Sequence, residues 1–221
     1  MENKGIKIKK IVQFIMKIFW IFVIGSVFGF FAEMLYALVY TRTLEIRQGL
    51  IYGPFIQIYG IGAIAYHLLV SKIKEPKRLF FSGMLMGGVL EYLCSFFQEI
   101  FWGTVSWDYS HLFMNLNGRV CLLYCFYWGV IAVAYLKIFY PGIQKLDDLI
   151  EKKGVRIFSI FFMLFMTFDI VISCMAADRQ QKRHQQLPPA NAIEVFLDEH
   201  YPDELMDRVY NNKKEVEFLP S

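Results

Sequence analysis

The sequence predicts an all-α polytopic membrane protein with about five transmembrane helices and a parallel two-helix repeat. Of its 221 residues, 56% are hydrophobic and 18% are aromatic, and the mean hydropathy is +0.39. The charged residues gather at the ends of long apolar runs, and a soluble domain of this size is rarely so apolar. We therefore expect a multi-pass protein of the cell membrane, whose apolar surface faces the lipid bilayer.

Five apolar stretches are long enough, or nearly so, to cross a bilayer, which takes about 20 mostly apolar residues. They are Ile18–Tyr40, Pro54–Val70, Leu79–Trp102, Val120–Phe139 and Val155–Ala177. The second is the shortest, and its proline suits a first helical turn. Lysines before the first stretch resemble the start of a signal peptide. That stretch is too long and lacks a good cleavage site, so we predict an uncleaved first helix.

Lysine and arginine fall mainly in alternate segments between the apolar stretches. Residues 4–17, 72–78 and 137–156 are rich in them, whereas the other connections hold few. Because short cytoplasmic loops carry an excess of positive charge, the N-terminus is predicted to be cytoplasmic. Five crossings then place the C-terminus outside. The basic cluster at 179–183 favours the alternative, in which one segment is re-entrant.

The chain divides into a transmembrane helical domain, residues 1–177, and a polar C-terminal tail, residues 178–221. Two consecutive prolines in the tail end any helix that continues from the fifth stretch. Asn191 followed by Glu194 then fits a capping box at the start of a short amphipathic helix. The tail is either a surface appendage or a helix that docks a partner.

The first and third stretches share a pattern in which two glycines and a glutamate follow at intervals of four residues. The members are Gly25, Gly29 and Glu33 in one, and Gly83, Gly87 and Glu91 in the other, continuing to Ser95 and Glu99. Each stretch leads through a polar loop to an aromatic–glycine pair, Tyr59-Gly60 or Trp128-Gly129. Both run in the same direction, so we predict a parallel repeat about an axis along the membrane normal. The alternative is coincidence, because glycine is common where transmembrane helices pack.

Carboxyl groups within the apolar stretches are the first candidates for a functional site. Glu33 and Glu91 lie well inside them, where an ionisable group costs roughly 2.5–3.5 kcal/mol on insertion scales. Such a group persists when it pairs, lines a watery cavity or stays protonated. Glu99 lies about 12 Å further along the helix than Glu91, near the outer interface. Asp169 in the fifth stretch is assigned either a helix-to-helix hydrogen bond or a place in the site.

Two polar loops add further candidates. One holds Arg47, and the other holds Asp108, Asn115, Asn117 and Arg119. The arginines could pair with the glutamates or hold an anionic group through two parallel hydrogen bonds. The alternative is anchoring to lipid headgroups, with the neighbouring tryptophan and tyrosine side chains in an aromatic belt.

Several kinds of chemistry have no support in the sequence. It has no phosphate-binding GxxxxGKS/T loop, HExxH or GxSxG. Four cysteines lie in apolar runs without zinc-ligand spacing, so we interpret them as small packing residues and expect no metal site or cofactor. The net charge of +3 is small and no basic arm is present, so we expect no nucleic-acid partner.

Together these motifs resemble the CmpB-like family, the ABC-transporter type IV family. They are Glu33, Arg47-x-Gly49-x-x-Tyr52-Gly53-Pro54-Phe55, Ile58-Tyr59-Gly60, Glu91, Glu99, Trp107-Asp108-Tyr109 and Asn115-Leu116-Asn117-Gly118-Arg119. The resemblance runs from about Phe19 to Pro141, with a weaker match at Asp169 and Arg179. Gln57 stands where the family has proline, and Trp107 follows a serine where a second tryptophan is common.

The resemblance implies a permease-like membrane component that binds or translocates a small solute, with a separate ATPase subunit or another membrane protein as partner. The alternatives are a membrane-embedded enzyme acting on a lipid or headgroup, and a structural or regulatory membrane partner. We expect the solute site in the outer half of the bilayer, built from Glu33, Arg47, Tyr52, Glu91, Glu99, Asp108, Asn115, Asn117 and Arg119.

Overall fold

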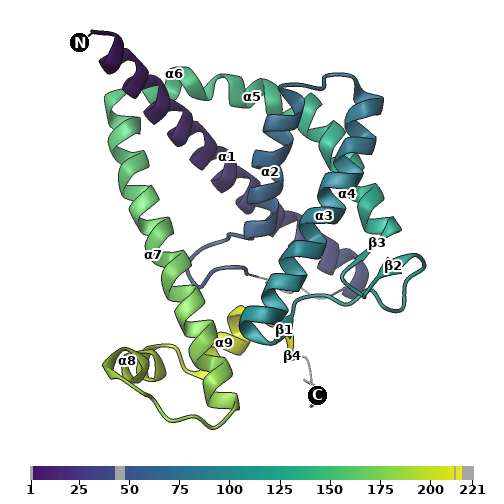
Figure 1. The fold of residues 1–221 in the computed structure, drawn as a ribbon, viewed down its shortest axis with the longest axis vertical. Helices are drawn as coiled ribbons and strands as arrows, with labels where there is room; N and C mark the ends of the chain where they lie inside the picture. Colours follow the sequence, from purple (N-terminus) through teal and green to yellow (C-terminus); the bar gives the residue numbers. More distant parts are fainter. Residues whose placement is uncertain (1, 43–47, 212, 216–221) are drawn as a thin grey trace.

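A computed structural model describes residues 2–42, 48–211 and 213–215. The helices are α1 (Glu2–Thr41), α2 (Gln57–Val70), α3 (Pro76–Trp102), α4 (Leu122–Ala134), a π-helical turn η1 (Tyr135–Phe139), α5 (Tyr140–Gln144), α6 (Leu146–Glu151), α7 (Lys153–His184), α8 (Ala192–His200) and α9 (Asp203–Val209). Short strands β1 (Thr104–Val105) and β4 (Lys214–Glu215) pair antiparallel, as do β2 (Asn115–Leu116) and β3 (Val120–Cys121). The predicted all-α fold is confirmed (Figure 1).

Four helical segments in the described ranges are long and apolar enough to cross a membrane. They are Lys7–Tyr40, Pro76–Trp102, Leu122–Glu151 and Lys153–His184. The second predicted stretch forms only the 14-residue α2, which spans about 21 Å at 1.5 Å per residue. A bilayer core is about 30 Å thick, so α2 does not cross it alone. The structure thus has four long helices and one short one where the sequence predicted about five crossings.

α1 and α2 form a closely packed helix pair. A side chain at Gly25 would collide with Ala63 of α2 and with the backbone at Tyr59, and one at Gly29 would collide with the Tyr59 ring. Small residues let transmembrane helices approach closely, which replaces the hydrophobic drive that is absent in lipid. The two glycines therefore set the distance between α1 and α2.

α3 and α4 repeat this arrangement. A side chain at Gly83 would collide with Ala132 and approach the backbone of Trp128, and one at Gly87 would collide with the Trp128 ring. Each contact matches one in the α1–α2 pair, with tryptophan in place of tyrosine. α1 and α3 also run in the same direction (Figure 1). The repeated sequence pattern is thus a repeated packing pattern.

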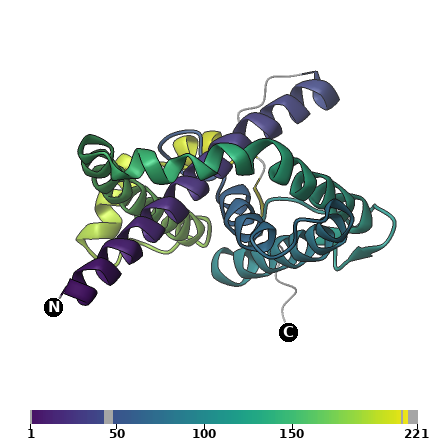
Figure 2. The same cartoon turned by 90° about the horizontal axis from the view of Figure 1, so that it is seen from above.

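An apolar core joins the two helix pairs. Tyr66 of α2 is fully buried and donates a 2.8 Å hydrogen bond to the backbone oxygen of Trp128 in α4. Tyr135 packs in the same cluster at the start of the π-helical turn. Pro141 lies just after that turn, and a proline within a helix removes a backbone hydrogen bond. From there α5 and α6 run across one end of the molecule to reach α7 (Figures 1 and 2).

Before α2, the connection at 48–56 reaches across to α7. The backbone N–H of Ile51 donates to Ser173 at 3.0 Å, and that of Tyr52 donates to Asp169 at 3.1 Å. Unpaired backbone groups are tolerated at membrane depth only when protein groups satisfy them. Asp169 therefore forms a hydrogen bond between two elements, which is one of the two roles that the sequence suggested for it.

The same connection also folds on itself. The Gln57 carboxamide donates to the backbone oxygen of Gly49 at 2.7 Å, and the Gly49 N–H donates to the backbone oxygen of Phe55 at 3.0 Å. The N–H of Ile56 donates to the backbone oxygen of Ser26 in α1 at 3.2 Å. Gln57, the residue that departs from the family pattern, thus supplies a hydrogen bond that proline could not.

The C-terminal tail packs against the end of α7, which continues to His184 rather than stopping near residue 177. Arg179 is only 2% exposed and forms two hydrogen bonds with Asp198 of α8, at 2.8 and 2.9 Å. These bonds hold the pKa of Asp198 below its usual value. Asn191 caps α8 by accepting from the N–H of Glu194 at 3.0 Å, as predicted.

The charged segments sort to the two ends of the molecule. The N-terminus, the α2–α3 connection and α5–α6 lie at one end, α8 and α9 lie at the other, and the β2–β3 hairpin lies to the side of α3 (Figure 1). All three lysine-rich segments therefore share one end.

This arrangement predicts that Lys74 and Lys152 face the cytoplasm and Asp108 faces outside, because lysine-rich segments stay inside. The measurement is labelling of single cysteines at these positions in intact cells, on a background without the four native cysteines. An impermeant thiol reagent should label position 108 alone. Labelling of position 74 with none at 108 would contradict the orientation.

The helix pairs predict a position-dependent response to Gly→Ala. At Gly87 or Gly29 the new methyl group meets the Trp128 or Tyr59 ring, and overpacking costs about 1–3 kcal/mol. Gly154→Ala is the matched control, since open space surrounds that position. In detergent, both core variants should melt several degrees below the native protein, as about 1 kcal/mol shifts Tm by roughly 2–4 °C at this size. Equal melting temperatures for all three variants would exclude the proposed packing.

Candidate functional site

Glu33 follows the two glycines of α1 and lies one turn beyond the Tyr59 contact. The Tyr59 hydroxyl donates a 2.6 Å hydrogen bond to Glu33 Oε1. The aromatic ring that fills the space at Gly29 therefore also holds the carboxyl group. Sequence spacing of four residues produces this alignment, because residues i and i+4 share a helix face.

Glu91 occupies the equivalent place in α3, behind Gly87 and the Trp128 ring. It is 5% exposed. Tyr109, from the loop after β1, donates a 2.9 Å hydrogen bond to Glu91 Oε1. The Trp128 side chain also interacts with the Glu91 carboxyl group. Glu91 Oε2 is buried and has no partner at hydrogen-bonding distance in the part of the chain that the structure describes.

The two carboxyl groups face a common region between the helix pairs. Glu33 is close enough to Glu91 for the two carboxyl groups to interact electrostatically, and both also interact electrostatically with the Tyr59 hydroxyl. Tyr109 stacks on Tyr124 with ring centroids 4.4 Å apart. Burial and the neighbouring Glu91 carboxyl raise the pKa of Tyr109, so its phenol stays protonated and donates. The region is therefore acidic and bordered by aromatic side chains.

A small cavity lies directly behind this region, between α1, α2 and α4. Its volume is about 30 Å³, which is room for one or two water molecules. Tyr59 and Trp128, with ring centroids 5.7 Å apart, line it on the side of the carboxyl groups. Tyr135 lines it further along, and its hydroxyl lies 3.2 Å from His67 Nδ1. Polar groups thus recur along the interface of the helix pairs.

Arg119, in the turn between β2 and β3, lies beside Glu99 of α3, which is two turns further along that helix than Glu91. It pairs with Glu99 at 2.5 Å and donates to the Ser95 hydroxyl at 3.4 Å. Its guanidinium group also lies over the rings of Tyr92 and Phe96, at 5.8 and 5.6 Å from their centroids. Arg119 therefore neutralises Glu99, which leaves the region of Glu91 acidic.

Three predicted site residues shape the loop between α3 and α4. Asp108 accepts from the N–H and the hydroxyl of Ser110, at 2.9 and 2.6 Å. Asn115 accepts from the N–H of Gly118 at 3.1 Å. Asn117 takes a left-handed conformation with φ of 54°, which asparagine adopts more readily than most residues. The Asp108 and Asn115 side chains therefore stabilise the turn that carries Arg119, whereas the Asn117 carboxamide donates to the Tyr92 hydroxyl of α3 at 3.2 Å.

The remaining predicted residues lie elsewhere. Arg47 falls outside the described residues. Tyr52 faces α7 and the tail, where its hydroxyl lies 3.0 Å from that of Tyr201 and its ring stacks on Phe168. The structure thus brings together Glu33 and Glu91, and separately Glu99 and Arg119.

Sequence reasoning missed the aromatic partners of the carboxyl groups. Tyr59 and Trp128 were noted only as parts of a repeated aromatic–glycine pair, and Tyr109 only as an interfacial aromatic. Tyr36, whose hydroxyl lies 3.1 Å from that of Tyr124, was not singled out. The repeat could have predicted these partners. Tyr59 and Trp128 occupy equivalent positions in the two halves, so each is expected to face the equivalent position of its partner helix.

The geometry predicts which charged pairs are coupled. Arg119→Ala and Glu99→Ala should be non-additive in their effect on thermal stability in detergent, with a coupling of about 0.5–3 kcal/mol, because the groups are in contact. Arg119→Ala combined with Glu91→Ala should be additive within about 0.5 kcal/mol. Equal coupling in the two cycles would mean that Arg119 also contacts Glu91.

Comparison with known protein families shows which family this chain resembles. The model of the family described as Putative ABC-transporter type IV matches residues 20–174. A search of curated proteins and a search of solved structures each found no match. The matched range takes in α2 to α6, most of α1 and most of α7, including both carboxyl groups and Arg119. The chain therefore belongs to the CmpB-like, ABC-transporter type IV family.

Proposed function

We propose that this protein is a permease-like membrane component that binds a small cationic solute at Glu33 and Glu91. One observation carries the proposal. The two carboxyl groups come from equivalent positions of two helix pairs, each accepts a hydrogen bond from a tyrosine, and they interact electrostatically with each other. The family membership supports a role connected with an ABC transporter.

The charge of the region favours a cation over an anion. Two carboxyl groups within electrostatic reach repel each other when both are ionised. Arg119 is engaged by Glu99 and so does not offset them. A bound cation would relieve this repulsion, and the Tyr59 and Trp128 rings offer faces that attract positive charge. An amine or quaternary ammonium group has the chemistry that this environment recognises.

The polar groups beyond the carboxyl groups support movement of the solute as well as binding. The small cavity continues past Tyr59 and Trp128, and Tyr135 and His67 follow toward the lysine-rich end. The cavity is too small for a solute, so passage requires the two helix pairs to separate. Intramembrane sites at the interface of structural repeats are common in transporters, where one repeat rocks against the other.

Any ATP hydrolysis would come from a separate subunit, since the sequence has no phosphate-binding loop. The surface formed by α5 and α6 lies at the end that the lysines predict to be cytoplasmic (Figure 2). We propose that end as the side on which an ATPase subunit would bind.

The proposal predicts that small amines, and not carboxylates or phosphates of similar size, raise the Tm of the purified protein. Glu91→Gln and Glu33→Gln should each weaken amine binding about tenfold or more, since a charge-assisted contact contributes about 1.5–3 kcal/mol. Glu75→Gln is the control, because Glu75 is exposed and pairs with Arg78. The amine that binds best is then tested for uptake into proteoliposomes.

Two results would contradict this function. Stabilisation by anions alone would show that the site does not select cations. Unchanged amine binding in both Gln variants would show that the carboxyl groups are not its ligands. Mass spectrometry of the natively purified protein adds an independent test, since a lipid headgroup bound at this place would favour an enzyme acting on lipid.

A further inference from the structure

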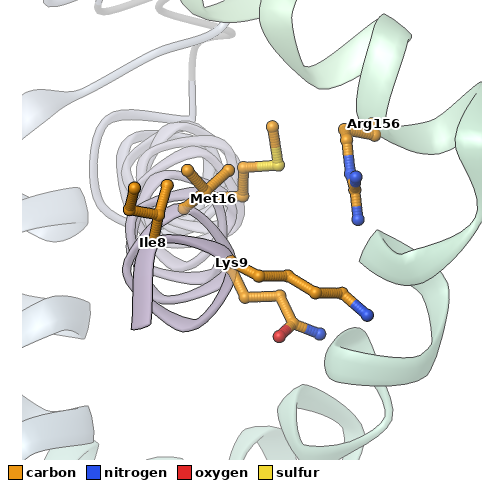
Figure 3. Close-up of a pocket in the computed structure, with 6 residues that line it drawn as sticks. Ile8, Lys9, Met16 and Arg156 are labelled. Atoms are coloured by element: carbon orange, nitrogen blue, oxygen red, sulfur yellow. The ribbon is translucent and has the colours of Figure 1, made fainter. Parts of the chain in front are cut away.

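A second pocket lies far from the carboxyl groups, between the N-terminal part of α1 and the start of α7. Its volume is about 260 Å³, near the lower end of the range for ligand pockets, roughly 300 Å³. It is lined by Ile8, Lys9, Val12, Gln13, Met16 and Arg156. Figure 3 shows that the side chains of Lys9 and Arg156 extend from opposite walls toward the same space.

Arg156 is the unusual member of this pocket. Its side chain forms no hydrogen bond or ion pair with any part of the chain that is described, and its Nε atom is buried. A guanidinium group has five N–H donors and stays charged. Leaving a buried charged donor unsatisfied is costly, so a ligand that accepts hydrogen bonds would remove this penalty.

The nearby acidic side chains are already engaged by α1. Lys17 pairs with Asp147 at 2.6 Å, and the Gln13 carboxamide donates to Glu151 at 2.8 Å. Lys9 lies 3.8 Å from Glu151, and its side chain is 61% exposed, so that pair is weak. These contacts join α1 to α6 and leave the pocket with a surplus of positive charge.

The other walls are apolar and open toward lipid. Ile8, Val12 and Met16 are spaced four residues apart and form one stripe of α1. Ile8 and Val12 are largely exposed. The pocket therefore combines cations with an apolar wall. Basic pockets between transmembrane helices on the cytoplasmic side suit anionic lipid headgroups.

We propose that this pocket binds an anionic phospholipid of the leaflet on the lysine-rich side. The guanidinium group of Arg156 and the ammonium group of Lys9 hold the phosphate, and an acyl chain lies along Ile8, Val12 and Met16. The apolar stripe argues for a lipid over a free phosphate ion, which would gain nothing from it. This site is independent of the solute site proposed at Glu33 and Glu91.

The test is native mass spectrometry of the full chain in detergent, titrated with phosphatidylglycerol, phosphatidylcholine or inorganic phosphate. Phosphatidylglycerol should bind at least several-fold more tightly than phosphatidylcholine. Arg156→Gln should weaken phosphatidylglycerol binding about tenfold, and Arg156→Lys should weaken it less, because it keeps the charge but loses the paired donors. Lys9→Gln, at an exposed position that does not threaten folding, should weaken binding several-fold.

Arg78→Gln is the matched control, since Arg78 lies at the same end, is 78% exposed and pairs with Glu75. It should bind phosphatidylglycerol as the native protein does. Equal losses in Arg156→Gln and Arg78→Gln would overturn the proposal, because the effect would then be one of overall charge. Displacement of the lipid by millimolar inorganic phosphate, or equal binding of phosphatidylcholine, would also overturn it.

Discussion

The contact between a glycine row and an aromatic ring is the interaction on which the rest of this structure depends. Helices in lipid gain little from hydrophobic burial against each other, so close van der Waals approach has to hold them together. At Gly29 and Gly87 the missing side chain is replaced by the ring of Tyr59 or Trp128. The Tyr59 hydroxyl also donates to Glu33 one turn further along, and the Trp128 side chain interacts with Glu91. One sequence pattern therefore determines both how closely the helices pack and where the carboxyl groups lie.

A second constraint explains why α2 is short and why α7 lies where it does. Residues 48–56 are not helical, so their backbone groups need partners at a depth without water. Asp169 and Ser173 of α7 supply two of these partners, and Gln57 supplies another. The fourth long helix is therefore tied to the first helix pair through hydrogen bonds. Polar residues inside an apolar helix here form a structural connection between elements.

The sequence predicted the features that depend on local periodicity, and missed those that depend on contacts between distant segments. The apolar stretches, the repeat of Glu33 and Glu91, and the cap at Asn191 all follow from spacing along one helix. The pairing of Arg119 with Glu99 rather than Glu91 does not, because spacing along one helix does not show which carboxyl group a residue of the following loop will reach. Tyr109 reaches Glu91 only through the path of an irregular loop, which no periodicity describes.

Several poorly exposed charges in the described parts of this protein are neutralised by near neighbours, as Arg179 is by Asp198 and Lys17 by Asp147. Within the described residues, four ionisable side chains keep a buried polar atom without a hydrogen-bond partner: Glu91, Arg119, Arg156 and Asp169. Of these, Glu91 and Arg156 belong to the two sites proposed above. Such an atom is destabilising in a medium of low polarity unless another component satisfies it. The two groups have opposite charge and lie toward opposite ends of the helices. The two proposed sites therefore differ in charge, which is why a cationic solute is proposed for one and an anionic lipid for the other.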